Sequence, residues 1–77
     1  MKLSDYLKAE RGRLATLARD IGAPISNTSE WASGRRPVPV ERCADIERAT
    51  DGAVTRRDLR PHDWARIWPE LAEKEVA

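Results

Sequence analysis

The sequence is poor in the residues that build metal and redox sites. Its 77 residues include one cysteine, Cys43, and one histidine, His62, and no phenylalanine. One cysteine excludes an intramolecular disulfide, and one histidine is too few for a metal cluster. No nucleophile paired with a base, no metal-ligand set and no phosphate loop is visible. We therefore expect a protein that is not an enzyme, with no catalytic residue, no metal and no cofactor, stabilised by packing alone.

Long hydrophobic runs are also absent. Apolar residues make up 40% of the chain and charged residues 35%, an ordinary balance for a globular domain. No apolar stretch is long enough for a transmembrane helix or a secretory signal. No segment alternates apolar and polar residues with the period of a strand. The sequence thus predicts a single helical domain over residues 1–77, in the cytoplasm and without membrane contact.

The net charge of +1 is small, but it is unevenly distributed along the chain. Residues 1–36 contain seven Lys/Arg and four Asp/Glu, which gives +3, and residues 37–77 contain seven against nine, which gives −2. A positive first half is typical of a surface that meets phosphate. In so short a chain the bias can equally arise by chance, so charge alone does not decide between the two interpretations.

Helical periodicity is clearest in the first half of the chain. One apolar stripe has spacings of three and four residues, and it consists of Leu14, Leu17, Ala18 and Ile21. We expect Gly22 to end this helix, because the residue after a helix often needs a positive φ. A preceding helix is expected to end at Gly12. A following helix is expected to run from about Pro24 to Gly34.

The second half of the chain predicts shorter helices. Pro39 can begin a fourth helix, whose apolar stripe includes Val40 and Cys43, and we interpret Cys43 as a core residue. Thr55 and Asp58 have the spacing of a capping box, which predicts the start of a fifth helix. The fold class is therefore all-α, a compact bundle of about five short helices.

Two of these helices form a distinct unit over residues 13–33. They are short, and they meet across the three-residue turn Gly22-Ala23-Pro24. This length and turn match a helix-turn-helix, whose second helix lies in the major groove of DNA. A short amphipathic pair inside an ordinary bundle, with a solvated polar face, is the alternative that the pattern leaves open.

The outward face of the helix over 24–33 follows from helical geometry. Trp31 is its large apolar anchor, so we place Trp31 and Thr28 inward. At about 100° per residue, the opposite face then carries Ser26, Ser29, Glu30 and Ser33. Short hydroxyl side chains allow close approach to bases or phosphates, and Ile25 can contact a thymine methyl. The predicted base-reading residues are Ile25, Ser26, Ser29 and Glu30.

Charged residues at the unit's edges complete the predicted site. Glu30 is discordant, because a carboxylate repels phosphate, although it can accept a hydrogen bond from cytosine N4. Arginines flank the unit, and in such modules flanking arginines hold phosphates. The predicted phosphate-binding arginines are Arg13, Arg35 and Arg36, with Arg11 and Arg19 as further candidates.

Nearly the whole chain, from Leu3 to Leu71, resembles a known family, and two stretches carry the resemblance most clearly. Residues 17–34, LARDIGAPISNTSEWASG, resemble the Cro/CI type of phage and prophage repressors, whose usual pattern is L-A-x-x-x-G-V-S-x-x-x-I-S-x-W-x-x-G. Residues 59–71, LRPHDWARIWPEL, are similar to a more specific string of the YdaS-like subgroup, often labelled an antitoxin. The resemblance implies a lambda-repressor-like domain in a bacterial or phage-infected cell. It also implies that the domain binds double-stranded operator DNA, usually as a homodimer, and represses transcription.

The resemblance also implies roles for particular residues. It places Ile25, Ser26 and Glu30 at base-facing positions, and it places Asn27 and Ser29 at flanking positions that often contact the DNA backbone. We therefore add Asn27 to the predicted phosphate contacts.

Two residues depart from the family pattern. Pro24 stands where Ser or Thr is usual, so a hydroxyl cap and its phosphate contact are missing. Thr28 stands where Ile or Val is usual, which weakens an anchor that faces the core. Together these departures indicate an altered base preference.

The C-terminal segment over residues 53–72 has two interpretations. Its apolar residues Trp64, Trp68 and Leu71 can seal the core, or they can form a dimer surface, since tryptophan is enriched in interface hot spots. The antitoxin label adds an alternative function. In that alternative, this segment neutralises a toxin partner by protein contact, and DNA autoregulation is secondary.

Overall fold

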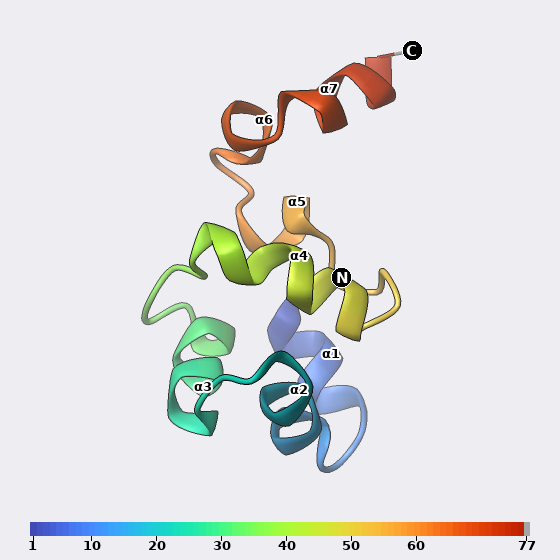
Figure 1. Ribbon diagram of the computed structural model, residues 1–77. Helices are drawn as coiled ribbons and strands as arrows, with labels where there is room; N and C mark the ends of the chain where they lie inside the picture. Colours follow the sequence, from blue (N-terminus) through green and yellow to red (C-terminus); the bar gives the residue numbers. More distant parts are fainter. Residues whose placement is uncertain (77) are drawn as a thin grey trace.

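The computed structural model describes the backbone of residues 1–76 and the side chains of residues 1–73. Its helices are α1 (Leu3–Ala9), α2 (Arg13–Ile21), α3 (Ile25–Ser33), α4 (Val40–Ala49), α5 (Arg56–Leu59), α6 (Trp64–Ile67) and α7 (Pro69–Val76), as Figure 1 shows. Residues 1–76 contain no strand, so the all-α prediction is confirmed. The helices outnumber the expected five because Pro61 and Pro69 divide the C-terminal part, since proline cannot continue a helix.

Helices α2 and α3 form the helical pair predicted for residues 13–33. Gly22 caps the C-terminal end of α2 with a φ of 71°, and the N–H of Ala23 donates to the carbonyl of Ala18 at 2.9 Å. Gly34 caps α3 in the same way, with a φ of 80°. Glycine takes this left-handed conformation without the steric cost of a Cβ. Both predicted helix ends are confirmed.

The core lies where α1, α2 and α4 meet. Its buried apolar side chains are Leu3, Leu17, Ala18, Ile21, Val38, Cys43, Ile46 and Val54. Trp31 and Trp68 pack against it from the margin. Burial raises the pKa of the Cys43 thiol to about 11, so this thiol is protonated at neutral pH. Cys43 is therefore a core residue, as the sequence indicated.

Two predictions about these helices are wrong. Gly12 does not end the first helix: α1 ends at Ala9, and Gly12, with a φ of 85°, is the N-cap residue of α2. A residue with positive φ is needed between the two helices, but periodicity does not show whether it ends the first helix or begins the second. Val40 is not part of the buried stripe of α4, since it is 41% exposed. It lies at the first position of α4, and the buried stripe begins one turn later, at Cys43 and Ile46.

The C-terminal helices extend the molecule away from the core. α5 begins at the predicted capping box: the N–H of Asp58 donates to Thr55 Oγ1 at 3.1 Å, and the N–H of Thr55 donates to Asp58 Oδ2 at 3.0 Å. α7 packs on α6, at the end of the molecule remote from α2 and α3 (Figure 1). The molecule is accordingly elongated, measuring 37 × 21 × 19 Å. No helix in the described part of the chain combines the length and the apolar character needed to cross a membrane.

Candidate nucleic-acid interface

Helix α3 is held to the bundle by the two residues that the sequence places inward. Thr28 is fully buried, and both its N–H and its hydroxyl donate to the Pro24 carbonyl, each at 3.1 Å. Trp31 packs against the core. The hydrogen bonds of Thr28 lie within the first turn of α3. The burial of Thr28 and the packing of Trp31 therefore fix the rotation of α3 about its own axis and determine which side chains face outward.

The opposite face of α3 is open to solvent. Ser26, Asn27, Ser29 and Ser33 are exposed, and Ile25 in the first turn is 53% exposed. Most side chains on this surface are short, and they include both polar and apolar groups, so the helix can approach base edges closely. The outward direction predicted for Ser26, Ser29 and Ser33 is observed, whereas Glu30 of the same predicted face is only partly exposed. Contact of these residues with DNA stays a prediction.

Glu30, the discordant residue, has a partner on this face. Its Oε2 lies 2.8 Å from Nε of Arg36 and is closed off from solvent. That oxygen accepts no hydrogen bond of good geometry, so the contact is an ion pair and not an aligned hydrogen bond. The Glu30 side chain is 30% exposed and that of Arg36 is 71% exposed. The guanidinium therefore lies beside the carboxylate and leaves most of its own surface open to solvent.

The turn after α3 brings Arg36 back to Glu30. With Gly34 in the left-handed conformation, the N–H groups of Arg35 and Arg36 donate to the Glu30 carbonyl at 3.0 and 3.4 Å. Sequence reasoning missed the pair, because residues six apart are not neighbours on a helix. The available signal was Gly34, since a glycine cap folds the following residues back over the last helical turn.

Arg35 and Arg36 differ in how far their positive charge is already paired within the protein. Arg35 is exposed and forms no ion pair or hydrogen bond through its side chain with the described residues. Arg36 shares its charge with Glu30. Only Arg35 therefore presents a full positive charge at the end of α3.

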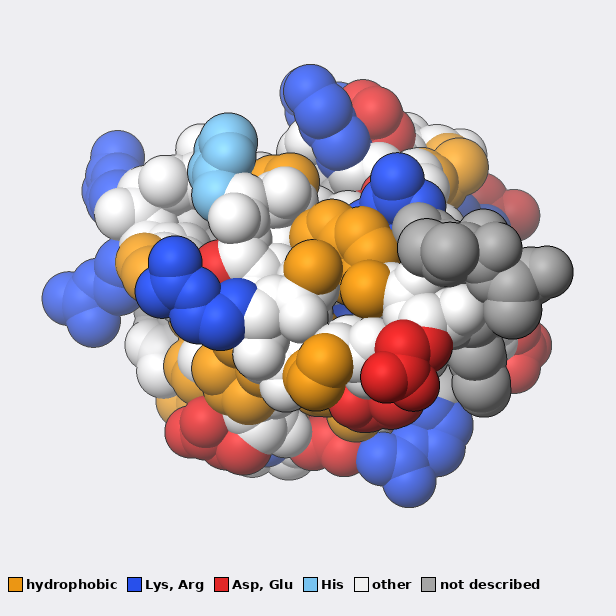
Figure 2. All heavy atoms as spheres, turned by 90° about the horizontal axis from the view of Figure 1, so that it is seen from above, with side chains coloured by type: hydrophobic (Ala, Val, Ile, Leu, Met, Phe, Trp, Pro, Cys, Tyr) orange, Lys and Arg blue, Asp and Glu red, His pale blue; other side chains and the backbone are white. Residues whose placement is uncertain are grey.

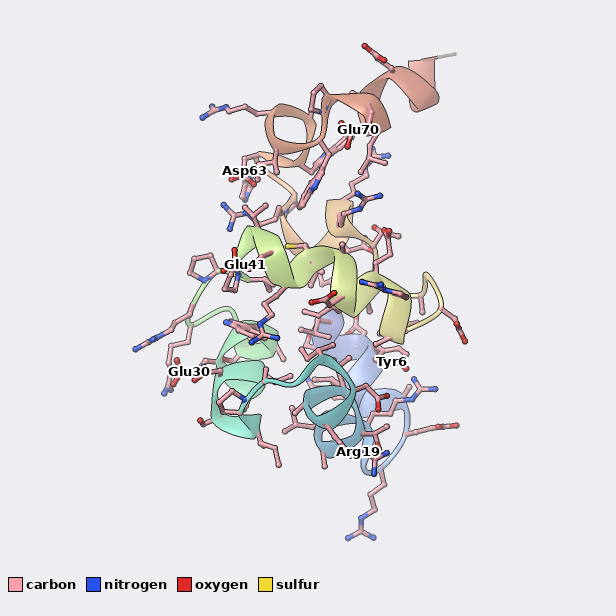
Figure 3. All side chains as sticks on the ribbon, viewed as in Figure 1. Tyr6, Arg19, Glu30, Glu41, Asp63 and Glu70 are labelled. Atoms are coloured by element: carbon pink, nitrogen blue, oxygen red, sulfur yellow. The ribbon has the colours of Figure 1, made fainter. Side chains whose placement is uncertain are left out.

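Arg13, the third predicted phosphate contact, is occupied within the protein. Its guanidinium lies 4.2 Å from the centre of the Tyr6 ring, donates to the Tyr6 carbonyl at 2.9 Å, and pairs with Glu10 at 3.3 Å. Tyr6 and Glu30 lie on opposite sides of the molecule in Figure 3. The structure thus uses Arg13 to hold α1 to α2, and it does not bring Arg13 together with Arg36.

A positive residue outside the helical pair also borders the candidate interface. Lys8 of α1 lines one shallow hollow with Ser29 and Ser33 of α3. Its ammonium group adds a positive charge beside the serines. The sequence carries no signal for Lys8, because its position depends on how α1 packs against α3.

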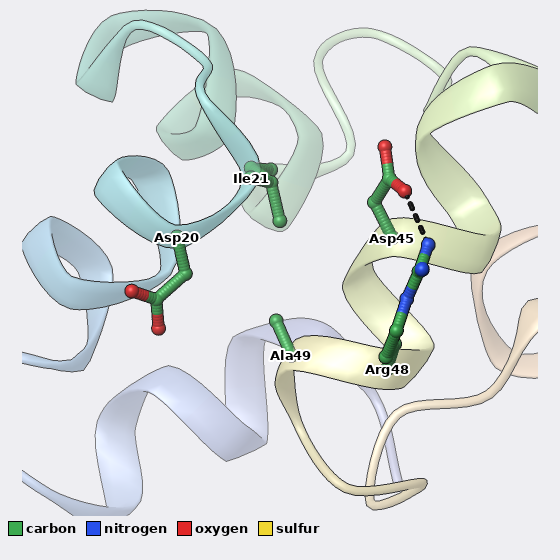
Figure 4. Close-up of a pocket in the computed structure, with 5 residues that line it drawn as sticks. All are labelled: Asp20, Ile21, Asp45, Arg48 and Ala49. Carbon is green, nitrogen blue, oxygen red and sulfur yellow. Dashed lines mark hydrogen bonds and ion pairs between the residues drawn. The ribbon is translucent and has the colours of Figure 1, made fainter.

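The groove between α2 and α4 is an unsuitable place for phosphate. It is lined by Asp20, Ile21, Asp45, Arg48 and Ala49 (Figure 4). Asp45 pairs with Arg48 at 2.7 Å, and the Asp20 carboxylate points away from that pair. Asp20 also has an arginine partner, Arg19 at 3.8 Å, so none of the lining residues offers an unpaired positive charge to an anion. Among the described residues, no three His, Cys, Asp or Glu side chains converge to hold a metal.

The C-terminal tryptophans have different surroundings. Figure 2 looks onto the α5–α7 end of the molecule, where apolar side chains reach the surface between charged ones. Arg56 lies 5.5 Å from the centre of the Trp68 ring, and Arg57 lies 4.9 Å from that of Trp64. Trp68 packs against the core, so the core interpretation holds for Trp68. Trp64 is half-buried beneath Arg57.

Comparison with known proteins places the amino-acid sequence in a family. The family model described as bacterial toxin YdaS matches residues 7–67, from α1 to the end of α6. The chain belongs to the YdaS family. A relative from Escherichia coli strain K12, named "Putative transcriptional regulator YdaS", is 42% identical over 57 residues, which are 73% of this chain and 58% of the relative. The chain therefore spans little more than half the length of that curated relative.

The YdaS match confirms the resemblance seen in the sequence, and it includes α3 with its flanking arginines. The two descriptions differ, because the family is described as a toxin and the relative is named as a transcriptional regulator. Neither description mentions an antitoxin. The antitoxin alternative therefore stays a prediction without a finding in its favour.

Proposed function

We propose that this protein is a DNA-binding transcriptional regulator that inserts α3 into the major groove of operator DNA. One observation carries the proposal: the burial of Thr28 turns a face of small, exposed side chains outward, next to Arg35, whose side chain has no ionic partner among the described residues. This combination fits a groove better than bulk solvent, which requires neither small side chains nor a flanking cation. The name of the YdaS relative supports the same class of function.

The proposed contacts divide into those that read bases and those that hold the DNA backbone. The base-reading residues are Ile25, Ser26, Ser29 and Glu30, and the phosphate contacts are Asn27, Arg35 and Arg36. Arg13 joins them only if it leaves the Tyr6 ring. We further propose that the protein acts as a repressor. As a homodimer, it binds a near-palindrome with half-sites about one helical turn apart.

Binding to labelled duplexes tests the proposal. A duplex pool with a randomised central region is enriched on the protein, and the enriched sequence is compared with a shuffled duplex of the same composition. We expect selective binding, with an affinity that falls steeply between about 50 and 200 mM salt, because phosphate contacts release counterions. Affinity that is flat with salt, or equal on the enriched and shuffled duplexes, contradicts the proposal.

The description of the YdaS family favours a second candidate, a toxin. Induced expression of the wild type and of a Ser29→Glu variant in Escherichia coli separates the two candidates. Ser29 is exposed, so the substitution adds an acid to the outward face without disturbing the core. Growth inhibition that the variant abolishes comes from DNA binding, and inhibition that persists in the variant points to a separate toxin activity.

A further inference from the structure

The ion pair between Glu30 and Arg36 lies on the face that we propose meets DNA. An unpaired carboxylate on that face would oppose the phosphate charge and weaken binding to every sequence. In this protein the carboxylate is half covered, because Oε2 is closed off from solvent at 2.8 Å from Nε of Arg36. The pair therefore offsets part of this repulsion before DNA binds.

Each partner keeps unused hydrogen-bonding capacity. A guanidinium has five N–H donors, and none of those of Arg36 donates a hydrogen bond within the described part of the chain, so its terminal nitrogens remain available. The Arg36 side chain is 71% exposed, which places that end toward solvent. Oε1 of Glu30 has no hydrogen-bond donor among the described side chains, and it remains able to accept from a base.

The pair is built into the end of α3. The N–H groups of Arg35 and Arg36 both donate to the Glu30 carbonyl, so the backbone that carries Arg36 is fixed relative to the residue it covers. A prepared arrangement of this kind loses little conformational freedom when a ligand binds. Arg35, one residue earlier, has the same backbone anchor and no carboxylate partner among the described residues.

We propose that Arg36 is a positioning residue for base reading by Glu30. Its Nε neutralises and orients the carboxylate so that Oε1 meets an amino donor such as cytosine N4, and its terminal N–H groups bind the neighbouring phosphate. The inference rests on the proposed function, since it assumes that α3 enters the major groove. Arg35 has the simpler role of a phosphate contact alone, and it serves as the matched control.

A double-mutant cycle on the enriched duplex tests the coupling. The affinity is measured for the wild type, E30Q, R36A and the double variant, and for a parallel cycle with R35A. Glutamine keeps the shape and the acceptor of Glu30 but removes its charge. We expect R36A to weaken binding about tenfold more in the wild type than in the E30Q background, and R35A to weaken binding equally in both.

The preferred base sequence gives a second readout, because loss of a phosphate-binding charge lowers affinity for every sequence and leaves the preferred sequence unchanged. Enrichment is repeated with R36A, R36K and R35A. We expect R36A to change the preference at the base pair that E30Q changes, and R35A to leave the preference unaltered. R36K should restore most of the affinity but not the preference, because lysine keeps the charge and lacks the planar guanidinium.

The outcomes separate this inference from the proposed function. A wild type that binds no duplex selectively overturns both. In a second outcome, the wild type binds selectively and with salt dependence, but the effects of R36A and E30Q on affinity are additive to within about twofold. That result overturns only the role of Arg36. An R36A variant that keeps the wild-type base preference does the same. Both arginines are exposed, and equal thermal unfolding of the variants verifies that each protein is folded.

Discussion

Thr28 shows how a single polar residue can serve as a core anchor. The family pattern has Ile or Val at this position, and the sequence therefore indicated a weakened contact. The structure shows a fully buried side chain whose hydroxyl donates to the Pro24 carbonyl, which already accepts the N–H of Thr28 itself. The Thr28 hydroxyl thus has a hydrogen-bond acceptor, but the Pro24 carbonyl keeps a donor even without that hydroxyl.

Replacing this hydroxyl by a methyl group should therefore stabilise the protein. We expect Thr28→Val to raise the free energy of unfolding by about 0.5–1 kcal/mol, because it buries a methyl group and leaves the Pro24 carbonyl with its backbone donor. Urea denaturation measures the change. Ser26→Val, which adds the same side chain on the exposed face, is the control and should change stability by less than about 0.5 kcal/mol. A less stable Thr28→Val protein shows instead that the hydroxyl is needed.

Arg35 carries a second prediction at the residue scale. Arg35→Ala should weaken binding to enriched and shuffled duplexes by the same factor and lower the salt slope by about one, as expected for one lost phosphate contact. Fluorescence anisotropy at several salt concentrations measures both quantities. Arg66→Ala removes the same charge from an exposed residue of α6 and should leave the slope unchanged. A loss confined to the enriched duplex indicates base reading by Arg35.

Single residues also show where sequence reasoning stops. The outward direction of Ser26 and Ser29 could be predicted, because it follows from helical geometry and one apolar anchor. The partners of Arg13 and Glu30 could not, because they depend on the packing of α1 and on the backbone reversal at Gly34.

At the scale of elements, Arg60 connects the C-terminal helices to the segment that follows α3. Its Nη1 donates to the Val38 carbonyl at 2.8 Å, and Nε and Nη2 donate to the Asp63 carboxylate at 3.0 and 2.6 Å. Val38 is buried, so this contact fixes the linker between α3 and α4. The sequence predicted the helix ends on either side but not this connection between them.

The Arg60–Asp63 pair predicts a pH dependence of stability. Hydrogen bonds from Arg60 lower the pKa of Asp63 in the folded protein, below the value of about 3.9 expected when the chain is unfolded. The ionised carboxylate thus stabilises the fold above about pH 4, and this contribution is lost as the pH falls through the folded pKa. The difference in melting temperature between wild type and Asp63→Asn should be constant from about pH 5 to 8 and should shrink below pH 4.

A control for net charge accompanies this measurement. Asp20→Asn removes the same charge from the groove between α2 and α4, outside the pair with Arg60. If both variants show the same pH profile, the effect comes from overall charge and not from the hydrogen bonds of Arg60.

Element boundaries could be predicted where local chemistry decides them. Gly22, Gly34 and the capping box at Thr55 act through neighbouring residues, and all three are confirmed. Gly12 and Val40 were placed wrongly, because periodicity does not assign a glycine to one of two helices or show where a helix first meets the core.

At the scale of the whole molecule, α6 and α7 stand away from the core that holds the candidate interface (Figure 1). Their half-buried apolar residues include Trp64, Ile67 and Leu71. Figure 2 shows that apolar side chains reach the surface at this end of the molecule. Composition predicted a possible dimer element here, but the separation of this end from α3 is visible only in the assembled fold. Such a separation allows pairing of two chains without covering the base-reading face.

We therefore expect that the protein is a dimer at micromolar concentration and that Leu71→Glu makes it monomeric, because a buried charge opposes an apolar contact. Sedimentation velocity measures the state, and thermal unfolding of the variant should still show a folded core, since α7 packs on α6 and lies away from α2 and α3. Ala65→Glu, at an exposed residue of α6, adds the same charge and should stay dimeric. A monomeric wild type, or a Leu71→Glu variant that remains dimeric, excludes this surface as the place where two chains meet.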